Sequence, residues 1–198
     1  MASSIIDSNY YRDMFGTSEM REVFSDDARL QGWIDTEIAL AKAQVKLGII
    51  PKGVDLVLQK AAKISNLDKV AMKEHFDKVG FPILPFVKQL NKACDPETAR
   101  WVHYGATTQD ILDTGMVLQM KQGIKIIETE LQAIITATAS LTKKHAKTVM
   151  AGRTFQQLAA PVTFGYKSGV WALRLGLSEG ILSSAGLHNH KKTPRGLP

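Results

Sequence analysis

Cysteine is nearly absent from this chain of 198 residues: Cys94 is the only one, so no disulfide can form within the chain. A single thiol is typical of a reducing compartment, and we expect a cytoplasmic protein. Long apolar runs are also missing, because no stretch approaches the roughly 18 to 20 apolar residues that a membrane span requires. The first residues, MASSIIDSNYYRDMF, lack a basic segment followed by an apolar one. We therefore expect neither a secretory signal nor a membrane partner.

The motifs of several ligand classes are missing as well. The sequence has no zinc-finger spacing, no glycine-rich phosphate loop and no alternation of aromatic and basic residues, so we expect no metal and no cofactor. The net charge of +6 would suit nucleic acid, but Lys191, Lys192 and Arg195 carry three of the six charges near the end of the chain. The other basic residues are interspersed with acidic ones, as on a solvated helical surface. We therefore expect no nucleic-acid partner.

Helical periodicity is what the sequence does contain, and it predicts an all-α fold. Over residues 26–47 the apolar positions recur mostly at steps of three and four, and Ser25 stands before them as an N-cap. No β-hairpin signature is recognisable. Shorter helices are predicted over residues 54–64, over 68–79, from Pro82 to about residue 94, and from Pro96 after the cap residue Asp95.

One predicted helix, from Asp110 to about Lys147, is on the order of 55 Å long at about 1.5 Å per residue. A compact domain of this size cannot cover such a helix alone. A bundle shared between subunits is therefore favoured over a two-helix hairpin within a monomer. The stripe that supports this reading has heptad spacing, is fully apolar only as far as Ile134, and comprises Val117, Met120, Ile124, Ile127, Leu131, Ile134, Thr138, Leu141 and His145.

The remaining chain suggests three regions. Residues 1–109 are expected to form an N-terminal helical domain, and residues 110–184 part of a central helical bundle. After the long helix we expect an irregular stretch from Met150 to Pro161, then a helix from Pro161 to about residue 182. Residues 185–198 lose all periodicity and gain proline, glycine and basic residues, so they are expected to be a disordered tail.

Two polar segments interrupt the helical pattern. In VHYGATTQD, Gly105 permits a tight turn, and Thr107 and Thr108 place hydroxyls beside the free N–H groups of the coming helix. This combination suits an anion, although one threonine acting as an ordinary N-cap would explain it too. In GRTFQQ, Arg153, Thr154 and Gln157 gather a guanidinium, a hydroxyl and an amide, which is a polar connection or a second binding segment.

Three longer segments resemble a known family. MREVFSDDARLQGWIDTEIALAKAQVKLGIIP is similar to the opening helix of adenylosuccinate lyases and 3-carboxymuconate cycloisomerases. WVHYGATTQDILDT looks like their first conserved block, and MAGRTFQQLAAPVTFG looks like the second. The resemblance, over about residues 14 to 175, is to the N-terminal part of a lyase of the fumarase/aspartase superfamily.

The resemblance implies a homotetramer around a central helical bundle, with each active site built from three subunits and a small polycarboxylic acid as substrate. Chemistry of this kind places extra negative charge on a carboxylate, which preorganised donors must meet. Thr107, Thr108, Thr154 and Gln157 would then bind substrate carboxylates. His103 would line the pocket, or would serve as a structural histidine in the turn. Arg153 and Phe155 would also line the pocket.

Three departures from the family pattern bear on the expected reaction. Phe155 stands where most branches carry a histidine and bacterial cycloisomerases carry tryptophan, and phenylalanine cannot transfer a proton. Met14 and Phe15 replace the Arg-Tyr pair with which adenylosuccinate lyases hold a nucleotide phosphate. The third block, a flexible loop with the serine base, is absent, so the catalytic base is unknown. We expect this chain alone to be inactive.

Three functional hypotheses follow. The leading one is a truncated 3-carboxy-cis,cis-muconate cycloisomerase-like lyase, which in aromatic-compound degradation adds a carboxylate reversibly across a conjugated diene acid and gives a muconolactone. The second is an adenylosuccinate-lyase-like enzyme acting on another succinyl adduct. The third is a non-catalytic paralogue that keeps the bundle as a scaffold or regulatory subunit.

Overall fold

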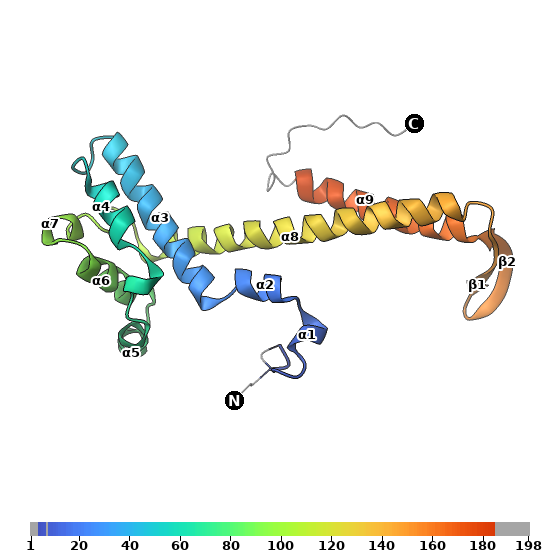
Figure 1. The fold of residues 1–198 in the computed structure, drawn as a ribbon, viewed down its shortest axis with the longest axis horizontal. Helices are drawn as coiled ribbons and strands as arrows, with labels where there is room; N and C mark the ends of the chain where they lie inside the picture. The colour runs from blue at the N-terminus through green and yellow to red at the C-terminus, as the bar shows by residue number, and fades with distance from the viewer. Residues whose placement is uncertain (1–3, 7, 185–198) are drawn as a thin grey trace. The chain divides into compact units, whose positions relative to one another are not determined.

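The computed structural model of the chain describes residues 4–6 and 8–184. The predicted disordered tail, residues 185–198, lies outside the described residues. The chain divides into two compact units, Met1–Gln122 and Gly123–Pro198 (Figure 1). Helices dominate both units, which confirms the all-α prediction.

The first unit is built from helices whose positions agree closely with the sequence predictions. The predicted helix over 54–64 is the exception, because it ends at Ala61, where the Asn66 side chain donates a hydrogen bond of 2.9 Å to the Ala61 carbonyl. A separate 3₁₀ turn follows. The elements are α1 (Arg12–Phe15), α2 (Ser18–Val23), α3 (Asp26–Lys46), α4 (Val54–Ala61), η1 (Ile64–Asn66), α5 (Lys69–Val79), α6 (Ile83–Ala93), α7 (Pro96–Ala99) and the start of α8 (Thr108–Lys144).

Two helix caps predicted from sequence are confirmed. The Ser25 hydroxyl accepts from the Ala28 N–H at 3.1 Å, at the start of α3. The Asp95 carboxylate accepts from the N–H groups of Glu97 and Thr98 at 3.0 and 2.9 Å, and Pro96 occupies the first turn of α7. Each bond satisfies N–H groups that a helix leaves without an internal partner.

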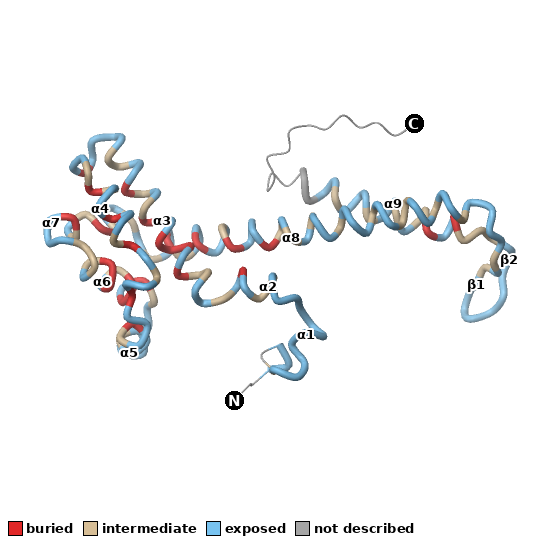
Figure 2. Tube along the Cα trace, viewed as in Figure 1, coloured by how far each residue is buried: buried red, intermediate tan, exposed pale blue. Residues whose placement is uncertain are grey.

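The core of the first unit lies between α3, α4, α6 and the first turns of α8. Figure 2 shows the buried positions gathered on these elements. Trp33 meets Phe86 edge to face at 5.5 Å between ring centroids. The most deeply buried apolar side chains are Ile34, Leu58, Ile83, Phe86, Leu90 and Ile111.

Two glycines allow α3 and α8 to approach closely. A Cβ added to Gly32 would lie 3.2 Å from the carbonyl oxygen of Gly115. A Cβ added to Gly115 would lie only 2.7 Å from Cδ1 of Trp33. Glycine inside a helix costs about 1 kcal/mol relative to alanine, so its presence at both positions indicates that the contact needs the space.

The second unit contains the only strands among the described residues, and they correct a prediction. The stretch expected to be irregular forms an antiparallel hairpin of β1 (Val149–Thr154) and β2 (Gln157–Thr163). Its two-residue turn, Phe155–Gln156, has positive φ at both positions (46° and 64°). Such a turn normally carries asparagine or glycine, which is why the sequence showed no hairpin signature.

Helix α9 (Phe164–Ser184) begins three residues later than predicted. Pro161 belongs to β2, where it pairs with Ala151. Proline is tolerated there because both strands of a two-stranded sheet are edges. The helix start is set instead by Thr163, whose hydroxyl accepts from the Tyr166 N–H at 3.0 Å.

In the second unit, α9 returns beside the C-terminal part of α8 (Figure 1). The hydroxyls of Thr142 and Ser168 lie 3.1 Å apart, and the His145 and Phe164 rings meet edge to face at 5.2 Å. The predicted heptad stripe nevertheless stays largely open, because Ile127, Ile134 and Leu141 are 48%, 47% and 37% exposed. An apolar stripe of this kind is typical of a surface that another helix covers.

We expect Gly115→Ala to lower the free energy of unfolding by about 1 to 3 kcal/mol, because the new methyl group would overlap Trp33. Gly176→Ala is the matched control, since a Cβ there has nothing within 4 Å; it should be neutral or stabilise by up to about 1 kcal/mol. Urea unfolding measures both. Equal effects of the two changes would contradict the close approach of α3 and α8.

We also expect the chain to form an oligomer through the exposed stripe on α8. Replacing Ile127 and Ile134 by lysine should shift the mass measured by light scattering towards the monomer, because two charges would have to be desolvated in a helical interface. Gln132→Lys, at another exposed position on the same helix, is the control. A parent chain that is a folded monomer at micromolar concentration would overturn this prediction.

Candidate functional site

The segment before α8 makes a sharp change of direction at His103 and Gly105, which have φ values of 60° and 71°. Glycine adopts such values freely, whereas a histidine needs support from its surroundings. Part of that support comes from Gln44 on α3, whose side-chain amide donates to the Tyr104 carbonyl at 2.7 Å. The turn is therefore held against α3.

The stronger contact comes from Glu37, also on α3. One carboxylate oxygen, Oε2, accepts from the backbone N–H of His103 at 3.1 Å, and the other, Oε1, lies 2.6 Å from Nδ1 of the imidazole. The Glu37 side chain is 1% exposed, whereas that of His103 is 20% exposed. The carboxylate thus contacts both the backbone and the side chain of one residue.

Burial raises the pKa of Glu37 above the ordinary value for a glutamate, and the hydrogen bonds and charge of His103 oppose that rise. Sequence reasoning did not single out Glu37. A signal was present, because Glu37 lies three residues after Ile34 and four before Ala41, on the buried face of α3. A charged residue in the middle of a buried face is rarely left unpaired and can mark a functional pair.

Thr107 and Thr108 lie at the start of α8, as predicted. The capping partner differs from the expected threonine hydroxyl, because the Asp110 carboxylate accepts from the Thr107 N–H at 2.9 Å. Among the described residues, no hydrogen bond engages either threonine hydroxyl. Two donors are therefore available beside a helix N-terminus, although the Asp110 charge competes with any anion there.

The second predicted segment is the turn of the hairpin. Thr154 and Gln157 are directly paired across it, so their side chains lie on the same face of the two-stranded sheet. Between them, Phe155 is 97% exposed. Arg153, the residue before Thr154 in β1, is also exposed. The structure thus brings together the hydroxyl and the amide that were expected to bind a carboxylate.

The predicted site residues therefore fall into two groups, each held by its own unit. His103, Thr107 and Thr108 belong to the first unit, and Arg153, Thr154, Phe155 and Gln157 to the second. Each group offers neutral hydrogen-bond donors, which are suited to carboxylate oxygens. Within the described residues, no group of three or more His, Cys, Asp or Glu side chains is placed to hold a metal ion.

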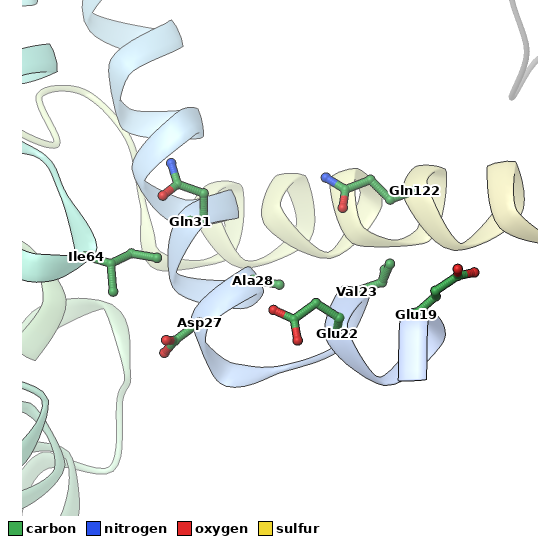
Figure 3. Close-up of a pocket in the computed structure, with 8 residues that line it drawn as sticks. All are labelled: Glu19, Glu22, Val23, Asp27, Ala28, Gln31, Ile64 and Gln122. Atoms are coloured by element: carbon green, nitrogen blue, oxygen red, sulfur yellow. The ribbon is translucent and has the colours of Figure 1, made fainter. Parts of the chain in front are cut away.

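A surface groove of about 470 Å³ in the first unit has a different character (Figure 3). Three of its lining residues are acidic, Glu19, Glu22 and Asp27, and the Asp27 carboxylate accepts from the Lys69 ammonium at 2.5 Å. The remaining carboxylates would repel an anion. The groove is therefore a poor match for a polycarboxylate.

Comparison with known proteins identifies the family. Residues 14–184 match the family model described as Lyase, so the chain belongs to this family, the fumarase/aspartase superfamily. Over the part of the chain that the structure describes, no helix is both long and apolar enough to cross a membrane.

Several relatives carry assigned names. An N-acetyl-S-(2-succino)cysteine lyase of Enterococcus italicus is 39% identical over 89% of this chain and 38% of its own length. A 3-carboxy-cis,cis-muconate cycloisomerase of Acinetobacter baylyi is 38% identical over 83% of this chain and 38% of its own. An adenylosuccinate lyase of Pyrococcus abyssi is 37% identical over 79% and 35%. The predicted similarity to both named branches is confirmed, and the chain spans under two fifths of these relatives' lengths.

A solved structure agrees with the fold. The β-carboxy-cis,cis-muconate cycloisomerase of Acinetobacter calcoaceticus has a TM-score of 0.85 and 35% identity, covering 89% of this chain and 42% of that one.

We expect that replacing both Thr107 and Thr108 by valine lowers the affinity for citrate at least about tenfold. Each hydrogen bond from a neutral donor to a charged group is worth about 1.5 to 3 kcal/mol in a sheltered site, and less where water reaches it. Because Asp110 accepts from the backbone N–H of Thr107, the helix cap remains and folding should be little affected. Calorimetric titration measures the change.

The matched control is the double change of both threonines to serine, which keeps the hydroxyls. Citrate should bind this variant as it binds the parent. If the valine variant binds citrate equally well, the two threonines belong to a helix start and to no anion site.

Proposed function

We propose that this chain forms the carboxylate-binding part of a 3-carboxy-cis,cis-muconate cycloisomerase-like lyase. The observation that carries the proposal is the pairing of Thr154 with Gln157 beside Phe155. Two neutral donors on one face of the sheet suit a substrate carboxylate, and the residue between them cannot transfer a proton. The 38% identity to a named cycloisomerase supports this choice of reaction.

In the proposed reaction a carboxylate oxygen of the substrate bonds to one carbon of a double bond in a conjugated diene acid, the carbon beside another carboxylate takes up a proton, and a muconolactone forms. The reverse reaction removes that proton and expels the lactone oxygen. Negative charge accumulates on the activated carboxylate in both directions. Preorganised donors stabilise that charge more strongly than water does, because they need no reorganisation when it forms. Thr107 and Thr108 in one unit, and Thr154 and Gln157 in the other, have this role, while His103 in the first unit and Arg153 and Phe155 in the second are pocket-lining residues.

The rest of the machinery is part of the same proposal. The serine base would come from a segment outside this chain, and the complete sites from a homotetramer whose bundle is covered along the stripe on α8. Residues 1–109 would form the N-terminal domain and residues 110–184 part of the bundle. The protein would act in the cytoplasm.

A second candidate is a lyase that cleaves another succinyl adduct. The observation in its favour is the 39% identity over 89% of the chain to an N-acetyl-S-(2-succino)cysteine lyase. Adenylosuccinate itself is disfavoured, because Met14 and Phe15 offer no cation for its phosphate. A non-catalytic scaffold is the remaining alternative, and it predicts no specific affinity for any of these acids.

We expect the chain to bind 3-carboxy-cis,cis-muconate and N-acetyl-S-(2-succino)cysteine at least about tenfold more tightly than adenylosuccinate. A missing charge-assisted hydrogen bond to the phosphate accounts for about 1.5 to 3 kcal/mol. Calorimetric titration with the three acids gives the order of affinity, and product analysis in the same samples reports any turnover. Equal, weak binding of all three would favour the scaffold.

The double change Met14→Arg with Phe15→Tyr supplies the missing cation and hydroxyl. It should raise the affinity for adenylosuccinate and leave that for 3-carboxymuconate unchanged. Preferential binding of adenylosuccinate by the unchanged chain would contradict the proposed substrate class.

A further inference from the structure

Glu37 and His103 contact each other, and of the two only His103 has a role in the function proposed so far, as a residue that lines the pocket. Its geometry is specific: Oε2 of Glu37 accepts from the His103 N–H at 3.1 Å, while Oε1 lies 2.6 Å from Nδ1. Among the described residues, Nε2 of His103 has no hydrogen-bond partner. The side chain is 20% exposed, so one edge of the ring faces a buried carboxylate and part of the ring reaches the surface.

We propose that Glu37 is a positioning residue that holds the proton of His103 on Nδ1, so that Nε2 is the atom that accepts a hydrogen bond or a proton from a ligand. This inference rests on the proposed function only in naming that ligand, a polycarboxylic acid. The tautomer itself is inferred from the contacts of the two residues, with Glu37 ionised.

The donors and acceptors of Glu37 and His103 limit where the hydrogen between them can lie. An ionised carboxylate can only accept hydrogen bonds, and the backbone N–H of His103 already occupies Oε2. With Glu37 ionised, the 2.6 Å contact at Oε1 requires a hydrogen on Nδ1, whereas a protonated Glu37 would donate its own hydrogen to Nδ1. In the neutral ring this leaves Nε2 without a hydrogen, and the tautomer of a histidine is generally set by the partner of its other nitrogen.

The arrangement of Glu37 and His103 has an energetic cost. A buried carboxylate loses its hydration, and an apolar side chain at position 37 would complete the buried face of α3 with less penalty. His103 is also held at a φ of 60°, which is uncommon for a residue other than glycine. A strained residue whose ring and backbone are both fixed by one buried carboxylate is typical of a functional site.

The chemical consequence is that His103 gives the site a group that can accept and release a proton. Phe155 cannot exchange protons, whereas Nε2 of His103 can accept one proton and become an imidazolium. The Nδ1–H of that imidazolium still bonds to Glu37, whose negative charge compensates the new positive charge. When the proton leaves, it leaves from Nε2, and the ring returns to the same tautomer. Glu37 does not need to touch the ligand for this role.

The test is a long-range ¹H–¹⁵N NMR experiment on the uniformly labelled 198-residue chain at a pH of about 9, where imidazole side chains are generally neutral. The spectrum identifies which ring nitrogen carries hydrogen, and loss of one signal set in His103→Asn assigns it. We expect the Nδ1–H tautomer for His103. The Nε2–H tautomer in the parent would overturn the proposal, because the shared proton would then lie on Glu37.

Glu37→Gln provides the second arm. Its amide oxygen can accept from the His103 N–H, but its NH₂ group must then donate to Nδ1, so the ring should switch completely to the Nε2–H tautomer. Asp35→Asn removes the same charge from an exposed position on the same helix and should change nothing. His145, whose Nδ1 lies 3.2 Å from the Thr148 hydroxyl, is an internal reference. An unchanged tautomer in Glu37→Gln would overturn the proposal.

Addition of citrate to the labelled parent separates this inference from the proposed function. The tautomer is measured without a ligand, so a chain that shows Nδ1–H but does not bind citrate supports the role of Glu37 and argues against the carboxylate site. A chain that binds citrate and shows Nε2–H overturns only the role of Glu37. If Glu37→Gln fails to fold, the measurement on the parent still decides the tautomer.

Discussion

The contact between the Glu37 carboxylate and His103 connects the longest helix of the N-terminal region to the turn that leads into α8. Glu37 is 1% exposed and holds both the backbone and the ring of a residue with a φ of 60°. The direction in which the chain enters α8 depends on that turn, which Gln44 also anchors through the Tyr104 carbonyl. The close approach at Gly32 and Gly115 then packs the same two helices against each other.

The two donor segments share a design despite lying in different units. In each, backbone with positive φ presents short polar side chains: His103 and Gly105 precede the threonines of α8, and Phe155 and Gln156 form the turn between Thr154 and Gln157. In both segments a tight turn holds neutral donors in place. This arrangement is consistent with a family whose named members include a 3-carboxymuconate cycloisomerase and an adenylosuccinate lyase.

The helices were predictable because their signals are local. Ser25 and Asp95 cap helices within three residues of themselves, and the apolar spacing of α3 repeats every turn. The hairpin was missed for the opposite reason. Its turn, Phe155–Gln156, lacks the usual asparagine or glycine. The residues around Pro161 predict a helix start, because nothing near it in the sequence reveals the strand opposite it. Pairing with Ala151 is a property of two segments together.

By itself, the sequence determined the helical class, the lyase family and the polar segments at residues 102–110 and 152–157, since each depends on residue types and spacings within one stretch of chain. Only the tertiary structure decided that Glu37 meets His103, that Gly32 approaches Gly115, and that Pro161 pairs with Ala151. Glu37 and His103 are 66 positions apart, and no local periodicity encodes such a distance. Their contact exists because α3 must bury its apolar face, and that burial carries the carboxylate into the interior with it.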